Sequence, residues 1–283
     1  MIRNSLPTEK IAIATITDEH FIKGTMVLLY SFLQKNSWFK GDIILISDSL
    51  LLEHKKQLSS FPNVKFKKIG EELLKRLEML CAYFPNYKSI HRRFFSIEAF
   101  NLVEYEKVLY LDSDILCCAS AEDFFSQKEY PLIAAPDFQY YLNKLREKET
   151  FIPVEQTNKH QSNTFKKVFN SGVMLVNNRL LEEATYIELL KLLTPIFYKN
   201  LQTSHTDQFL LNHFFEGKVK FSDYRYNFLL HAKEAITLKE RPNLEQLVFI
   251  HYSKKNKPWF NNSKRDKFEE LWNQYFQLSL EAK

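Results

Sequence analysis

The sequence predicts an α/β fold, with a single Rossmann-like domain built on a mostly parallel central sheet. Short apolar runs alternate with amphipathic stretches through the first half of the chain, which is typical of strands that alternate with helices. The 283 residues contain only five glycines and no repeat or linker-like tract, so one domain is the simplest organisation. A 45% share of hydrophobic residues is enough for a large core. Such an alternation places helices on both faces of a parallel sheet.

The predicted elements follow this alternation in order. Strands are predicted at residues 11–17, 42–47, 64–67 and 108–111, and helices at residues 23–34, 49–60 and 92–102. The second half of the chain is less regular. Residues 140–167 are rich in lysine and contain glutamine and asparagine, which predicts a long excursion that serves as a lid or an acceptor-binding loop.

The last segment, residues 263–283, predicts an amphipathic helix. Its apolar side chains recur at helical spacing, namely Phe268, Leu271, Trp272, Tyr275 and Phe276. Such a stripe packs more often on the body of its own protein. The alternative is contact with a membrane surface, because basic residues accompany the stripe.

Charge and composition narrow the function classes. Lysine and arginine (39) exceed aspartate and glutamate (34) by only five, so the chain requires no nucleic-acid partner but suits anionic ligands or an anionic membrane surface. The sequence has no run of eighteen apolar residues, and residues 1–10 are polar where a secretory signal would be apolar, so we expect a cytoplasmic protein. An odd count of three cysteines suits reduced thiols, and zinc is not expected without short-spaced Cys/His clusters.

Two aspartates follow the most apolar predicted strand. Asp112 and Asp114 come directly after residues 108–111, at the carboxyl edge where ligands of α/β sheets collect. Residues i and i+2 of an extended chain point to one side, so these like charges repel each other unless a cation lies between them. Oxygen ligands suit Mg²⁺ or Mn²⁺, which could bridge a diphosphate. The alternative is an exposed turn in which the motif only caps the next segment.

Five segments together resemble a known family. They are residues 104–114, residues 14–18 with Phe21 and Lys23-Gly24, residues 169–177, residues 207–212, and His251-Tyr252 followed by Lys257-Pro258-Trp259. Taken in their order along the chain, they are similar to glycosyltransferase family 8, the group of glycogenin and the bacterial lipooligosaccharide galactosyl- and glucosyltransferases. The resemblance spans roughly residues 11–260, and it implies a GT-A-type domain over residues 1–262 that binds a nucleotide sugar, followed by the C-terminal helix at 263–283.

The resemblance implies a role for each matched residue. Asp112, Asp114 and His251 would hold Mn²⁺ or Mg²⁺. Asp207, Gln208 and Lys257 would be catalytic. The donor would be bound by Thr15, Thr17, Asp18, Phe21, Arg93, Asp112, Ser113, Asp137, Asn170, Ser171 and Lys257. Among these, Thr17 and Asp18 would hydrogen-bond uracil and Phe21 would stack on it, in place of the family's usual tyrosine.

Several of these residues also have an ordinary structural interpretation. Asp18 could simply cap the following helix while Phe21 packs in its core. A lone histidine such as His251 is more often a core-edge residue, Asp207 could complement a helix dipole, and Lys257 could be solvated surface. The residues Asn170-Ser171-Gly172 could be a turn, although glycine there would allow the backbone to approach a donor sugar.

Two departures from the family pattern affect its basic positions. Lys254 stands where the family commonly has a glycine. The basic residue expected before the metal motif aligns with Ser96 in the glycogenin pattern and with Arg93 in the bacterial pattern. We favour Arg93, with Arg92 as the alternative.

The resemblance predicts an enzyme of the hexosyltransferase type. It implies transfer of glucose or galactose from a UDP-sugar to a glycan or glycolipid acceptor, with retention of configuration, as in bacterial surface polysaccharide or lipooligosaccharide synthesis. The leading mechanism is front-face transfer, with Gln208 as the runner-up nucleophile or ion-pair stabiliser. The alternative is a non-catalytic or self-glucosylating, glycogenin-like UDP-sugar-binding protein. A nucleotidyltransferase, kinase or phosphohydrolase is disfavoured, because the sequence has no glycine-rich phosphate loop.

Overall fold

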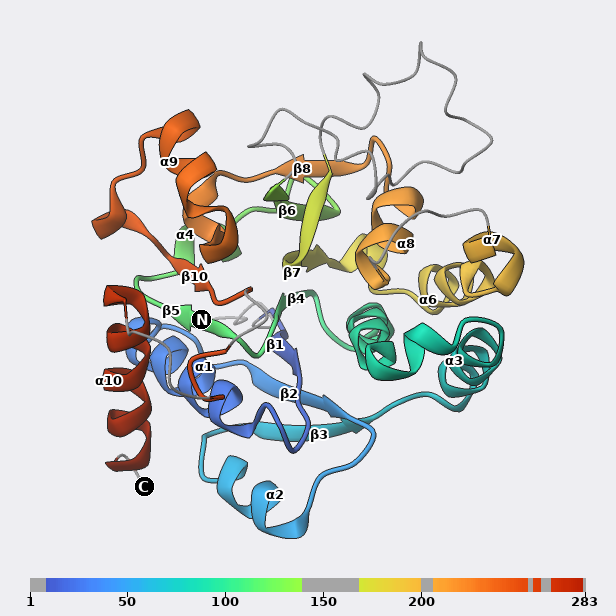
Figure 1. Ribbon diagram of the computed structural model, residues 1–283, viewed down its shortest axis with the longest axis horizontal. Helices are drawn as coiled ribbons and strands as arrows, with labels where there is room; N and C mark the ends of the chain where they lie inside the picture. The colour runs from blue at the N-terminus through green and yellow to red at the C-terminus, as the bar shows by residue number, and fades with distance from the viewer. Residues whose placement is uncertain (1–8, 139–167, 200–205, 254–256, 261–265, 282–283) are drawn as a thin grey trace, which may run out of the picture.

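A twisted sheet forms the centre of the fold (Figure 1). The computed structural model describes residues 9–138, 168–199, 206–253, 257–260 and 266–281. Across this part of the chain, the larger sheet has the order β3-β2-β1-β4-β7-β6-β8. Strands β3, β2, β1 and β4 are parallel to one another, and β7 runs antiparallel to both β4 and β6. The α/β class with a mostly parallel sheet is confirmed.

The strands are β1 (Ile11–Ile16), β2 (Asp42–Ser47), β3 (Val64–Lys68), β4 (Lys107–Leu111), β5 (Ile115–Cys117), β6 (Leu132–Pro136), β7 (Phe169–Asn177), β8 (Val219–Phe221), β9 (Phe228–Leu229) and β10 (Phe249–His251). The α-helices are α1 (Ile22–Lys35), α2 (Leu52–Leu58), α3 (Glu71–Tyr83), α4 (Glu122–Phe125), α6 (Glu183–Leu192), α7 (Pro195–Lys199), α8 (Asp207–Phe214), α9 (Lys233–Glu240) and α10 (Lys267–Glu281). Short 3-10 helices are η1 (Pro85–Ser89), η2 (His91–Asn101), η4 (Asn178–Leu180), η5 (Tyr224–Tyr226), η6 (Leu230–Ala232) and η7 (Leu244–Gln246).

Strand β4 shows how the sheet separates two cores. Val108 and Tyr110 pack on the side of η2, α3, α6 and α8, whereas Leu109 and Leu111 pack on the side of α1, α2 and α4. This alternation follows from the two-residue period of a strand. Because both faces are covered, all five residues of β4 are buried, and only its carboxyl end opens to a ligand.

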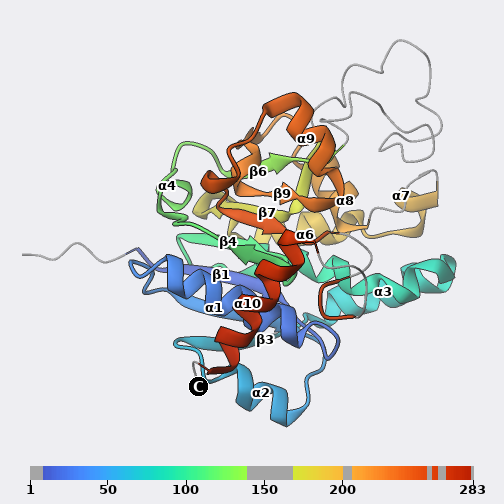
Figure 2. The same ribbon diagram turned by 60° about the vertical axis from the view of Figure 1, so that its left-hand side comes forward.

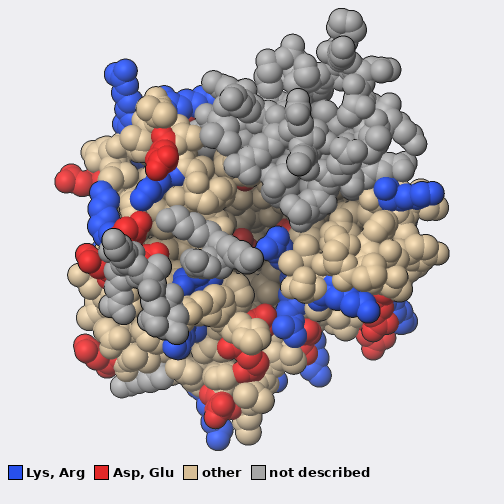
Figure 3. Space-filling view, in the orientation of Figure 1, with Lys and Arg blue, Asp and Glu red and all other residues tan. Residues whose placement is uncertain are grey.

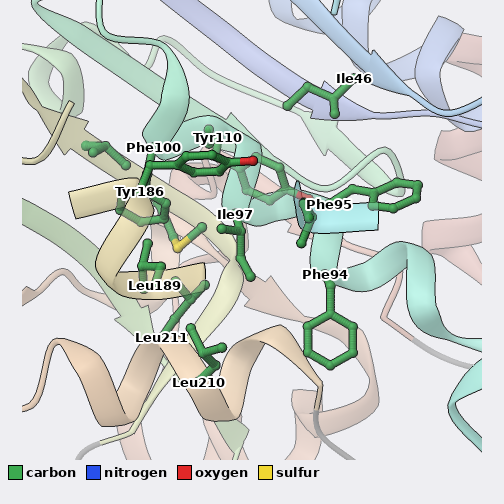
Figure 4. Close-up of a cluster of buried hydrophobic side chains, with 14 of the residues drawn as sticks. Ile46, Phe94, Phe95, Ile97, Phe100, Tyr110, Tyr186, Leu189, Leu210 and Leu211 are labelled. Carbon is green, nitrogen blue, oxygen red and sulfur yellow. The ribbon is translucent and has the colours of Figure 1, made fainter. Parts of the chain in front are cut away.

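The predicted strands agree with the structure to within one residue at each end, but one helix prediction is wrong. The sequence predicts an α-helix over residues 92–102, and the chain instead forms the 3-10 helix η2. All seven residues from 94 to 100 are buried, so this segment has no polar face and no period of 3.6. Figure 4 shows Phe94, Phe95, Ile97 and Phe100 among apolar side chains of α6 and α8. Tertiary packing overrides helical propensity here.

A second, smaller sheet with the order β5-β10-β9 adjoins the first. Strand β5 begins just after the Asp112-Ser113-Asp114 segment, and it pairs antiparallel with β10, so that His251 lies opposite Ile115. The backbone N–H of Tyr252 also donates to the carbonyl of Asp114, at 2.9 Å. The junction of the two sheets therefore brings the end of β4 beside the end of β10.

Helix α10 covers α1 on the outside of the molecule (Figure 2). Trp272 is 1% exposed, stacks on Phe276 and packs at a tilt against Trp259, with ring centroids 5.3 Å apart in both pairs. The apolar stripe predicted for residues 263–283 thus faces the body, although the predicted domain bounds stay a prediction. No helix in the described ranges is long and apolar enough to cross a membrane. The excursion predicted at residues 140–167 lies outside the described residues.

Candidate active site

A cavity of about 380 Å³ opens at the carboxyl ends of β1 and β4. Its size is typical of a small-molecule site. Every site residue expected from the sequence lines it except Thr15. The side chain of Thr15 is 2% exposed, and its hydroxyl donates to the Ile16 carbonyl at 3.4 Å. The structure therefore does not bring the Thr15 side chain into the cavity.

Asp112, Asp114 and His251 meet at one wall of this cavity. The His251 Nε2 lies 3.1 Å from Asp114 Oδ1 and 3.6 Å from Asp112 Oδ2. One ligand atom from each residue falls within 4.8 Å of the others. Two carboxylates and one imidazole nitrogen form a donor set that fits a divalent cation such as Mn²⁺ or Mg²⁺. The structure thus brings together all three residues expected to ligate a metal.

The two carboxylates of Asp112 and Asp114 concentrate negative charge beside His251, and this changes the pKa of all three residues. Burial would raise the pKa of Asp114, but the charges of Lys257 and His251 outweigh burial and hold that pKa well below its usual range. Although 39% of the Asp112 side chain is exposed, its partial burial and the neighbouring Asp114 charge raise the pKa of Asp112. Burial would lower the pKa of His251, but the charges of Asp114 and Asp112 prevail and raise it. A bound cation would relieve the repulsion between the two carboxylates.

Residues of the central sheet position Asp112 by hydrogen bonds. Its backbone N–H donates to the Gly172 carbonyl at 2.8 Å, and the Tyr110 hydroxyl donates to its Oδ1 at 2.9 Å. The Tyr110 hydrogen bond was not foreseen from the sequence. The available signal was position, because residues 110 and 112 are two apart on an extended strand and can share a face.

Gly172 in β7 provides the space for this arrangement. A Cβ built there would lie 2.4 Å from His251 Cε1 and 2.8 Å from Asp112 Oδ2. The sequence interpretation connected this glycine with approach of the backbone to a donor sugar. The structure supplies a different requirement, since the side chains of His251 and Asp112 fill the space that a side chain at position 172 would need.

The predicted base-binding residues lie at the carboxyl end of β1. Thr17 accepts a hydrogen bond from the Thr25 hydroxyl at 2.8 Å. Asp18 Oδ1 accepts from the backbone N–H groups of His20 and Phe21, at 2.8 and 3.1 Å. Asp18 therefore orders the turn before α1 and lines the cavity at the same time. The Phe21 ring, which also lines the cavity, packs edge-on against Trp259 at 5.4 Å between centroids.

The three residues considered for the basic position have different surroundings. Ser96 is 1% exposed and donates to Asp207 Oδ2 at 2.9 Å, so it lies beneath the cavity. Arg92 bridges Asp18 and Asp48 at 3.3 and 3.0 Å. Both arginines line the cavity, and Arg93 forms no ion pair with any described residue. The preference for Arg93 over Arg92 stays a prediction.

A buried polar network forms another part of the cavity wall. The Asn170 side-chain amide donates to Asp137 Oδ1 at 3.1 Å and to Gln208 Oε1 at 3.0 Å. The Ser171 hydroxyl donates to Asp207 Oδ2 at 2.9 Å. Gln208 Nε2 is buried and has no acceptor among the described residues, although its residue lines the cavity. Such a donor needs a partner, and a ligand oxygen in the cavity would supply one.

Lys257 reaches this site from the last described loop. Its ammonium contacts Asp114 Oδ2 and donates to the Tyr252 carbonyl at 2.9 Å. The lysine is therefore part of the site, and its predicted action on a departing diphosphate stays a prediction.

Sequence reasoning missed several residues that line the cavity. Phe138, His231 and Ser253 line it, and the sequence interpretation assigned a role to none of them. His231 follows β9 and Ser253 follows β10, two strands that are parallel neighbours. Only this pairing, which the sequence does not reveal, brings both residues to one edge.

Residues 12–263 match the family model described as glycosyl transferase family 8. The chain belongs to this family. Lipopolysaccharide glucosyltransferase WaaO of Escherichia coli (strain K12) is 27% identical over 271 residues, which cover 87% of this chain and 72% of WaaO. Glycosyltransferase GlyA of Streptococcus pneumoniae serotype 4 is 25% identical over 235 residues, covering 78% of this chain. The match spans only 30% of GlyA, so the chain corresponds to a part of that longer protein.

Solved structures of glycosyltransferases share the fold. The galactosyltransferase LgtC, in complex with donor and acceptor sugar analogs, superposes with a TM-score of 0.67 at 16% identity and covers 95% of both chains. GlyE of Streptococcus pneumoniae TIGR4 superposes with a TM-score of 0.64 at 21% identity, covering 96% of this chain and 62% of GlyE. At such identities the likeness establishes the GT-A-type fold of this family 8 chain.

Proposed function

We propose that this family 8 chain is a Mn²⁺-dependent, retaining hexosyltransferase that transfers glucose or galactose from a UDP-sugar to a glycan or glycolipid acceptor. One observation carries the proposal. Asp112, Asp114 and His251 converge within 4.8 Å on the wall of a cavity that also holds buried, sugar-compatible polar groups. A non-catalytic or self-glucosylating protein is the alternative.

The protein's own residues would divide the donor between them. Thr17, Asp18 and Phe21 lie where the base would bind, and Arg93 lies on the cavity wall as a cation that can reach phosphate or sugar oxygens. Mn²⁺ bound by the aspartates and histidine would stabilise the negative charge of the departing diphosphate. Lys257 is close enough to add a second positive charge.

Gln208 is better suited to hold the sugar than to attack it. Its Oε1 accepts hydrogen bonds from Asn170 and from the Ser171 backbone N–H, at 3.0 and 3.3 Å. Among the described residues its Nε2 has no acceptor, so it can donate to a ligand. A neutral amide is a weak nucleophile, so this arrangement favours front-face transfer with retention. Asp207, whose carboxylate accepts hydrogen bonds from three hydroxyls, would keep this wall rigid.

The setting of the reaction is proposed from the relatives. WaaO is named for lipopolysaccharide, and LgtC was solved with sugar analogs, which supports a glycan or glycolipid acceptor in bacterial surface polysaccharide or lipooligosaccharide synthesis. Three free cysteines suit a reducing cytoplasmic location. Figure 3 shows acidic and basic side chains interspersed on this face of the molecule, which argues against a nucleic-acid partner. Peripheral contact with the inner membrane face stays part of the proposal.

A UDP-release assay tests the proposal. UDP-glucose and UDP-galactose are offered with and without Mn²⁺, and with and without a glycan acceptor. We expect Mn²⁺-dependent turnover with one donor, its stimulation by acceptor, and an anomeric configuration in the product that matches the donor. Asp114→Asn should abolish turnover, whereas Asp123→Asn, at an exposed position on α4, should leave it unchanged. Near wild-type turnover by Asp114→Asn would refute the metal assignment, and sugar attached to the chain itself would favour the self-glucosylating alternative.

A further inference from the structure

Asn227 is a buried asparagine beside the metal site that no sequence motif marks. It is 0% exposed and immediately precedes β9. Its Oδ1 lies 3.0 Å from His251 Nδ1, and its Nδ2 lies 2.9 Å from Asn170 Oδ1. One side chain therefore contacts both His251 of the proposed metal site and the buried polar network of the cavity. We call this network, which consists of Asp137, Asn170, Ser171, Asp207 and Gln208, the sugar-side wall.

Two backbone N–H groups determine which atom is oxygen and which is nitrogen in the side-chain amides of Asn170 and Gln208. The Gly172 N–H donates to Asn170 Oδ1 at 3.0 Å, so this atom must be the oxygen. The Ser171 N–H donates to Gln208 Oε1 at 3.3 Å, so the Asn170 atom facing Gln208 must be the amide nitrogen. Both constraints give the same orientation of Asn170, because a backbone N–H can only donate.

The orientation of Asn227 follows from that of Asn170. Since Asn170 presents its oxygen, Asn227 must present its NH₂ group, and its own oxygen then faces His251. A reversed Asn227 would set oxygen against oxygen on one side. The ring of His251 therefore has to donate from Nδ1, which leaves Nε2 without the proton in the neutral ring. That Nε2 is the atom directed at Asp114 and Asp112.

We propose that Asn227 is a positioning residue that fixes the Nδ1–H tautomer of His251 and connects the metal ligands to the sugar-side wall through one directed chain of hydrogen bonds. Within the described ranges, Asn227 is the one hydrogen-bond partner of His251 Nδ1. The tautomer part depends on the protein alone. The consequence for metal binding rests on the proposed function, because a neutral imidazole must offer an unprotonated nitrogen to a metal.

The tautomer is tested in the metal-free protein by ¹⁵N-labelled histidine NMR, at a pH where the His251 ring is neutral. We expect the wild-type ring to show a protonated Nδ1 and an unprotonated Nε2. Asn227→Leu keeps similar volume and removes the acceptor, so the tautomers should mix. Asn227→Asp keeps an acceptor for Nδ1 but loses the NH₂ group that donates to Asn170, so it should retain the Nδ1–H tautomer while lowering the stability of the protein. A predominant Nε2–H ring in the metal-free wild type would overturn the proposal without any variant, even where Asn227→Leu fails to fold.

Metal affinity is measured on the same proteins by electron paramagnetic resonance titration with Mn²⁺. Asn227→Leu should bind Mn²⁺ about 10–100-fold more weakly than wild type. Asn36→Leu is the matched control, because Asn36 is 1% exposed and its side chain also hydrogen-bonds Phe32 and Ala121, but it lies outside the cavity lining. The control should lose stability and keep both the tautomer and Mn²⁺ affinity.

The two measurements separate the outcomes. If wild-type protein binds no Mn²⁺, the proposed metal-dependent function fails, while the NMR result still decides the role of Asn227. If wild type binds Mn²⁺ and folded Asn227→Leu retains both the tautomer and the affinity, the positioning role is refuted and the proposed function stands. An equal loss of affinity in Asn36→Leu and Asn227→Leu would also overturn it, since the effect would then be general destabilisation.

Discussion

Substitution of Gly172 by alanine should disable the metal site while leaving the backbone unstrained. The added Cβ would stand 2.4 Å from His251 Cε1, whereas ordinary contacts begin at 3.4 Å, so the ring must move by about 1 Å. Strand β7 cannot yield easily, because it is hydrogen-bonded between β4 and β6. Displacement of about 1 Å at a reacting centre can cost about 100-fold. We therefore expect Mn²⁺ affinity and donor turnover to fall by about 100-fold, or about 3 kcal/mol.

Gly217→Ala is the informative control for this substitution. Gly217 has a φ of +72°, and no atom of the described chain lies within 4 Å of the point where an added Cβ would stand. Alanine there therefore costs backbone energy of about 1 kcal/mol and creates no contact. At Gly172 the situation is reversed, because an added Cβ would collide with neighbouring atoms but the backbone φ is not positive. Thermal unfolding and Mn²⁺ titration of both variants distinguish the two effects. The reasoning is refuted if Gly172→Ala binds Mn²⁺ like wild type, or if Gly217→Ala weakens Mn²⁺ binding as strongly.

Three further predictions concern pH, the basic position and the C-terminal helix. His251 and Asp112 both have a raised pKa, and both must lose a proton before they can bind a metal. The affinity for Mn²⁺ should therefore be highest at alkaline pH, decline as the His251 ring becomes protonated, and fall further below the Asp112 pKa of about 6. An affinity that stays constant down to pH values below that pKa would contradict this reasoning. Arg93→Ala should raise KM for the UDP-sugar about tenfold without lowering the melting temperature, and the assignment is wrong if only Arg92→Ala raises KM. Trp272→Ala should lower the free energy of unfolding by about 3–5 kcal/mol in urea titrations, whereas Leu278→Ala, 44% exposed on the same helix, should change it by less than about 1 kcal/mol.

The sequence was sufficient to predict those site residues that also stand in a recognisable local pattern, such as the end of a buried strand. Asp112 and Asp114 follow a buried strand, and the rule that ligands gather at carboxyl ends of parallel strands placed them correctly at the cavity. His251 could be joined to them only through the family resemblance, because its position depends on the pairing of β10 with β5. The GT-A-type fold followed from the same resemblance, and the superposition on LgtC confirmed it.

The features that escaped prediction have a common physical origin in tertiary packing. Helix η2 has seven successive buried residues, so no amphipathic period could reveal its backbone. Asn227 looks like any asparagine before a short strand, and its role arises from hydrogen bonds to residues 170 and 251, which are distant in sequence. Gly172 illustrates a third case. A need for glycine there could be expected from the sequence, but the reason is the nearby side chains of Asp112, just after β4, and His251 in β10.

The junction between the two sheets also leads us to expect that the site forms late in folding. Strands β1 to β4 can pair using the first half of the chain, whereas β10 must return from its far end to lie beside β5. Contacts of such long sequence separation close late, because a large loop entropy opposes them. We therefore expect the carboxyl end of β1 to form before Asp112, Asp114 and His251 come together, so that a metal ion would stabilise the folded chain more than it would speed folding. In native-state hydrogen exchange, β10 should open at lower free energy than β1.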